Sequence, residues 1–99
     1  MRAADLAVYA DTLAGEAAAL DARIERARAQ LRQAALEREA RAALPAAAVG
    51  SLEALGYLRP VDEAPLRCAL ESWRRCLDAL ELLQAWVESE LAAPAATAA

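Results

Sequence analysis

The residue types that most often carry chemistry are scarce in this sequence. It contains no His, so the commonest general base and metal ligand is absent. Its two cysteines, Cys68 and Cys76, are eight residues apart, and a zinc site would need carboxylates or a second chain beside them. The paired acids Glu37 and Glu39 are two residues apart, a spacing at which side chains diverge on a helix. We therefore predict a non-enzyme with no catalytic residue, no metal ligand and no cofactor.

The charge balance argues against nucleic acid and membrane surfaces as partners. The net charge is −4, and an acidic surface repels phosphate backbones and anionic lipid. The Arg residues between 23 and 41 alternate with acids instead of gathering on one helix face, as a nucleic-acid-binding helix would require. No stretch reaches the roughly 18 to 20 apolar residues that span a bilayer.

Two further features indicate where the protein works. The N-terminus has no basic segment followed by an apolar core, so we predict no secretory signal. On one helix Cys68 and Cys76 would lie about 12 Å apart, too far to bridge each other. We therefore expect free thiols in a reducing cytoplasm, with a disulfide between two chains as the alternative. Abundant Ala, and Arg without Lys, are typical of a GC-rich bacterial genome.

Residues 4–43 are predicted to form one long helix that ends before Pro45. Their apolar residues alternate in spacing between three and four, which is the a/d pattern of a coiled coil. These seam positions are Leu6, Ala10, Leu13, Ala17, Leu20, Ile24, Ala27, Leu31 and Ala34. The pattern then fails, and we expect the stripe to rotate to Leu36, Ala40 and Leu44.

Residues 45–62 are predicted to form the connection, with a short helix at about 51–56. Ser51 would cap this helix at its start, and Gly56 would end it in the C′ position. An eighteen-residue connection is long for two packed helices, so we expect it to form a lid over that end of the molecule. Its apolar cover would come from Tyr57, Leu58 and Val61.

A second long helix is predicted over residues 63–92, with Asp62 as its N-cap. Its apolar stripe is wide and comprises Leu66, Ala69, Leu70, Trp73, Cys76, Leu77, Leu80, Leu83, Val87 and Leu91. Residues 94–99 follow a last Pro and are expected to form a flexible tail, which leaves residues 1–93 as a single domain.

These elements predict an all-α fold, an antiparallel helical hairpin of two long helices with a short helix in the connection. The core we expect consists of Leu13, Leu20, Ile24 and Leu31 against Leu70, Trp73, Leu77 and Leu80. The second helix offers more large side chains than the Ala-rich seam can cover, so we expect a homodimer that forms a four-helix bundle. The residues predicted for self-association are Leu66, Trp73, Leu77, Leu80 and Leu83.

Leu82 and Trp86 lie four residues apart and well away from the main stripe, with Ala79 and Cys68 at similar angles. Three interpretations stay open: the connection or a partner helix covers this strip within the fold, the strip binds another protein, or the pair is exposed without a role. Because Trp is a common anchor at interfaces, we assign Leu82 and Trp86 to partner binding.

The sequence as a whole favours a cytoplasmic protein–protein interaction module, such as an adaptor, a small chaperone or an assembly subunit. Its partners would be itself, another protein, or both. The alternative is a helical regulator or effector-binding domain that encloses a small apolar ligand. In that case the connection would be a lid over a pocket lined by Tyr57, Trp73, Cys68 and Cys76.

Overall fold

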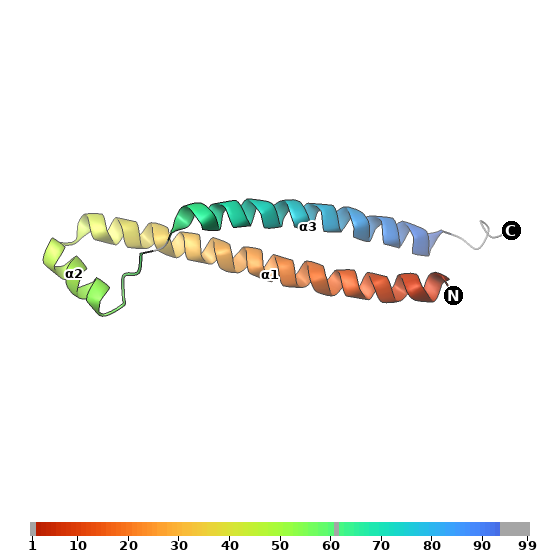
Figure 1. Cartoon of the computed structure of the whole chain (residues 1–99), viewed down its shortest axis with the longest axis horizontal. Coiled ribbons are helices and arrows are strands. Elements are labelled where there is room, and N and C mark those ends of the chain that lie inside the picture. Colours follow the sequence, from red (N-terminus) through yellow and green to blue (C-terminus); the bar gives the residue numbers. More distant parts are fainter. Residues whose placement is uncertain (1, 61, 94–99) are drawn as a thin grey trace.

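The computed structural model describes residues 2–60 and 62–93, and this part of the chain contains three helices and no strand. They are α1 (Arg2–Ala43), α2 (Ala46–Ala54) and α3 (Glu63–Ala92). The two long helices lie side by side and antiparallel, so α1 begins and α3 ends at the same end of the molecule (Figure 1). The prediction of an all-helical fold with two long, packed helices is confirmed. Val61 and the proposed tail, residues 94–99, lie outside the described residues.

The long helices pack through the alternating three- and four-residue spacing of their apolar side chains. All nine seam positions of α1 are buried or half-buried, with Ile24 the most deeply buried at 1% exposed. In α3 the same spacing runs from Glu63 to Val87, and Val87 is fully buried. Two helices with this repeat pack along a narrow seam, because side chains in the a and d positions interlock. The predicted core residues all lie in this seam.

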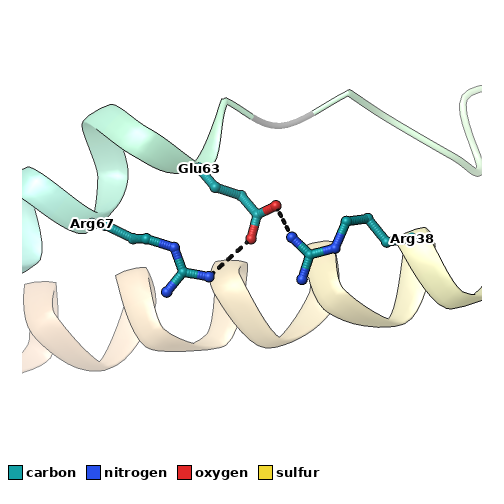
Figure 2. A network of polar contacts seen from close by, with 3 residues as sticks. All are labelled: Arg38, Glu63 and Arg67. Carbon is teal, nitrogen blue, oxygen red and sulfur yellow. Dashed lines mark hydrogen bonds and ion pairs between the residues drawn. The ribbon is translucent and has the colours of Figure 1, made fainter.

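Ion pairs join α3 to α1 near both of its ends. At the start of α3, the Glu63 carboxylate lies between the guanidinium groups of Arg38 on α1 and Arg67 one turn further along α3 (Figure 2). Near the other end, Arg2 Nη2 lies 3.0 Å from Glu90 Oε2. Asp62 occupies the N-cap position as predicted, but its side chain makes no capping hydrogen bond. The charged groups therefore contribute to the alignment of the two helices along the seam.

The predicted rotation of the stripe near the end of α1 is wrong for Leu36 and Leu44, although Ala40 is half-buried. Leu36 and Leu44 are 61% and 41% exposed, whereas Glu37 is buried at 7%. The physical reason is that α3 begins beside Arg38, so α1 does not pack against α3 beyond that level (Figure 1). The short helix α2 lies there instead, and Arg41 of α1 pairs with Glu53 of α2 at 3.4 Å. The connection takes the place of α3 here, and the Arg59 backbone N–H donates a 3.4 Å hydrogen bond to Glu37 Oε1.

The short helix starts five residues earlier than predicted. It begins at Ala46 with Pro45 as its N-cap, so Ser51 lies inside the helix and does not cap it. Three consecutive Ala residues after a Pro favour helix, since Ala has the highest propensity and Pro is compatible with a helix start. Gly56 ends the helix with φ of +81°, in the left-handed region that Gly adopts without strain.

The connection does not form the extensive lid that the sequence predicted. α2 buries none of its residues and lies at the end of the molecule opposite the start of α1 (Figure 1). Leu58, just beyond it, is buried at 7%, whereas Tyr57 is 71% exposed. The connection therefore covers only a small area of the hairpin through Leu58.

Candidate interaction surface

The two flanks of the α1–α3 seam differ in chemistry. On one flank, charged side chains border two seam residues, the buried Ile24 and the half-buried Leu77. They are Asp21, Arg28, Arg74, Asp78 and Glu81. Acidic and basic groups alternate here, and Arg28 pairs with Glu25 at 2.6 Å. Such a flank is stable in water, since its charged groups keep their hydration while their alkyl stems cover the seam.

The opposite flank has an apolar groove at the middle of the hairpin. Its floor is formed by Leu20 from α1 and by Leu80 and Leu83 from α3. Its other lining residues are Glu16, Ala19, Arg23, Cys76 and Ala79. Three of these eight residues are leucines and two are alanines, so only Glu16 and Arg23 bring charge to the groove. We call it the central groove.

A second groove on the same flank lies where α1 begins and α3 ends. It is lined by Arg2, Asp5, Leu6, Tyr9 and Trp86, and we call it the terminal groove. Both grooves lie on one flank because Tyr9, Glu16 and Arg23 are seven residues apart, as are Ala79 and Trp86. In a coiled coil, positions seven apart share one side of the helix. Together the two grooves make one flank of the hairpin largely apolar.

Arg23 is held at the edge of the central groove by an aromatic side chain. Its guanidinium carbon lies 5.5 Å from the ring centroid of Trp73, within the range of a cation–π interaction. Trp73 itself is half-buried in the seam. This contact crosses from α1 to α3 and positions a positive charge beside an apolar surface.

The structure places all five predicted self-association residues in the seam or at its border. Leu66, Trp73, Leu77, Leu80 and Leu83 are each half-buried. Only Leu80 and Leu83 line the central groove, whereas Leu77 borders the charged flank. Their role in self-association stays a prediction, because packing of α3 against α1 accounts for part of their burial.

Leu82 and Trp86 are not covered by the connection. They are 74% and 49% exposed, and α2 lies at the far end of the molecule from Trp86 (Figure 1). Trp86 forms one side of the terminal groove with Leu6 and Tyr9, while Leu82 lines neither groove. Sequence reasoning missed Tyr9, which is 42% exposed. The positions that flank the seam of α1 on one side would have pointed to it.

The two cysteines are free and exposed. The interpretation of Cys76 as an apolar residue of the seam is therefore wrong. Its neighbour in the sequence, Leu77, takes the seam position, and Cys76 lines the central groove one residue to the side. Leu91, also predicted in the stripe, is 40% exposed because it lies in the last turn of α3.

The residues of the ligand-pocket alternative lie in different places. Tyr57 lines a third groove with Gly56, Arg59 and residues of α1 between Ala29 and Glu37. Cys76 lines the central groove, and Trp73 lies beneath Arg23. Nothing in these positions forms a common pocket around an apolar ligand.

Residues 2–60 and 62–93 contain neither a metal-binding cluster nor a membrane-spanning helix. No group of three or more His, Cys, Asp or Glu side chains lies close enough together to hold a metal ion. None of the helices in this part of the chain is both long and apolar enough to cross a membrane. Comparisons with family models, curated proteins and solved structures found no match for this chain.

Proposed function

We propose that this protein is a non-enzymatic protein–protein interaction module that works through coiled-coil-like helix packing, as an adaptor, small chaperone or assembly subunit. The observation that carries the proposal is the apolar flank formed by the central and terminal grooves on an otherwise charged hairpin. Exposed apolar surface that is contiguous and bordered by polar residues is typical of binding sites.

The small hydrophobic core supports the same proposal. Among the described residues, two large side chains, Ile24 and Val87, are less than 2% exposed. The molecule measures 78 × 19 × 16 Å, so it has a large surface for its size and little interior. A chain of about 100 residues needs extensive burial to offset the entropy of folding, and a two-helix hairpin provides less than a bundle does. Association with another helical surface would supply the missing burial.

The proposal gives separate roles to two sets of α3 residues. Leu80 and Leu83 face the central groove and would contact the bound surface, whereas Leu66, Trp73 and Leu77 would hold α3 against α1. The larger exposed side chains, Leu82 and Trp86, extend the surface that a partner would cover. An aromatic ring in a shallow groove is a common energetic anchor of such contacts.

The experiment is sedimentation equilibrium over a wide range of protein concentrations, with reductant present. We expect the wild type to associate reversibly above the 10.5 kDa mass of one chain. Leu83→Glu places a charge in the central groove and should shift association to at least tenfold higher concentration. Leu36→Glu is the matched control, since Leu36 is 61% exposed and lines neither groove. Circular dichroism checks that both variants keep their helicity.

A wild type that keeps the mass of one chain at all concentrations would argue against self-association. Equal effects of Leu83→Glu and Leu36→Glu would argue against the central groove as the binding surface.

A further inference from the structure

The geometry points to a second copy of this chain as the occupant of the apolar flank, packed antiparallel with α1 against α1 and α3 against α3. This inference rests on the proposed function and specifies its partner and geometry. Three observations carry it: the charges that line the central groove, the small residues at its middle, and the length of the flank.

The charges of the central groove are self-complementary. Glu16 and Arg23 both line it. The midpoint between them along α1 falls between Ala19 and Leu20. A two-fold axis that crosses the helices at this level reverses the direction of α1. Glu16 of each copy then faces Arg23 of the other, so one dimer contains two such pairs. Glu16 forms no ion pair with another described residue, and its carboxylate is thus available to a second chain.

Small residues occupy the level where the two copies would approach most closely. Ala19 on α1 and Ala79 on α3 line the central groove, and both are exposed. A two-fold axis brings each of these side chains close to its own counterpart, and Ala allows the backbones to approach without a clash. Leu20, Leu80 and Leu83 around them would interlock with the leucines of the second copy.

The position of the central groove allows the two copies to overlap along nearly the whole of α3. This helix runs from Glu63 to Ala92, and Cys76, Ala79 and Leu80 lie close to its middle. With a two-fold axis at this level, nearly all of α3 lies alongside α3 of the second copy. The alternative, α1 against α3 of the other copy, would leave Glu16 opposite the apolar residues near Leu83 with no basic partner.

The hairpin face that carries this flank is large enough for a standard dimer interface. The 30 residues of α3 extend about 45 Å at about 1.5 Å per residue. With the 19 Å width of the molecule, the outline of the hairpin face is on the order of 850 Å² per chain, which leaves room for the roughly 800 Å² per partner that a standard interface buries. The charged flank remains outside, facing water.

Cysteine cross-linking tests the geometry in a background in which Cys68→Ser and Cys76→Ser remove the native thiols. We expect Ala19→Cys to form a disulfide between two chains under mild oxidation, since the two-fold axis brings the new thiols together. Ala22→Cys is the matched control: Ala22 is also an exposed Ala of α1, but it does not line the grooves. It should remain monomeric on a non-reducing gel.

Charge reversal provides the second test. Glu16→Arg places two Arg residues opposite each other in both pairs, and we expect it to weaken dimerisation about tenfold. The double variant Glu16→Arg, Arg23→Glu restores opposite charges and should recover most of the loss. Helicity measured for each variant separates a change in association from a change in folding.

The outcomes separate this inference from the proposed function. A dimer in which Ala22→Cys cross-links and Ala19→Cys does not, or in which neither does, overturns the antiparallel geometry while self-association stands. A dimer that is insensitive to Glu16→Arg, or that the double variant fails to rescue, overturns the predicted charge pairing. A wild type that stays monomeric overturns both the inference and the self-association on which it rests.

Discussion

At the scale of single residues, the most deeply buried side chains are those of seam positions where α1 and α3 pack against each other. Ile24 was predicted in the core from its spacing alone, because its neighbours in the three-and-four pattern are all Ala or Leu. The burial of Glu37 could not be predicted the same way. Glu37 lies beside the seam, and burial of an acid is unfavourable unless a hydrogen-bond donor is nearby. That donor, the Arg59 backbone N–H, comes from a connection with no periodic pattern.

The clearest test of the core is Ile24→Ala. Ile24 is 1% exposed, so truncation leaves a cavity between α1 and α3, and we expect the free energy of unfolding to fall by about 2–5 kcal/mol. Urea unfolding followed by circular dichroism measures the change. Leu36→Ala serves as the control because Leu36 is 61% exposed, and a surface substitution there should change the stability by less than about 0.5 kcal/mol. Equal losses in the two variants would contradict the seam as described.

Trp86 separates folding from association at a single position. Since its side chain is 49% exposed, Trp86→Ala should leave helicity and the urea midpoint of the monomer nearly unchanged. The same substitution removes the largest side chain of the terminal groove, and we expect the dissociation constant of the dimer to rise about 10- to 30-fold. Val8→Ala, at a 67% exposed position that lines neither groove, is the matched control. A variant that unfolds would instead place Trp86 in the core of the chain.

At the scale of the elements, the long helices were easier to predict than the connection. Residues 6–34 and 63–87 contain a sustained repeat, and the observed helices, Arg2–Ala43 and Glu63–Ala92, include both segments. The connection has no repeat of apolar residues, and two different signals in its sequence could mark the start of its short helix. Ser51 is a favourable N-cap, but the Ala residues after Pro45 form helix before Ser51 is reached. Which positions near the end of α1 are exposed depends on the level at which α3 begins. The sequence of α1 does not indicate that level.

Gly15 offers a test of helix energetics away from the proposed interface. It lies within α1, and a Cβ added there would meet no atom within 4 Å. Gly15→Ala should therefore raise the free energy of unfolding by about 0.5–1 kcal/mol. Gly56→Ala is the contrasting variant, because φ of +81° strains any residue with a Cβ, and it should destabilise the protein. Thermal unfolding of both variants measures these changes: the midpoint should rise for Gly15→Ala and fall for Gly56→Ala. A destabilised Gly15→Ala would contradict an open environment at this position.

At the scale of the whole molecule, the hairpin resembles half of a four-helix bundle. One flank is charged and well hydrated, whereas the other has the grooves that Leu20, Leu83 and Trp86 line. The excess of apolar side chains was visible in the sequence of α3. The flank that carries this excess could not be read from the sequence, because it depends on how α3 is rotated about its axis against α1.

The measurement that tests self-association most directly is light scattering coupled to size-exclusion chromatography, on the wild-type protein with and without reductant. We predict a mass near twice 10.5 kDa in both conditions, since the dimer would form by helix packing and not through Cys68 or Cys76. A stable, helical species with the mass of one chain would contradict the account. In that case the central and terminal grooves would be ordinary surface of a monomer.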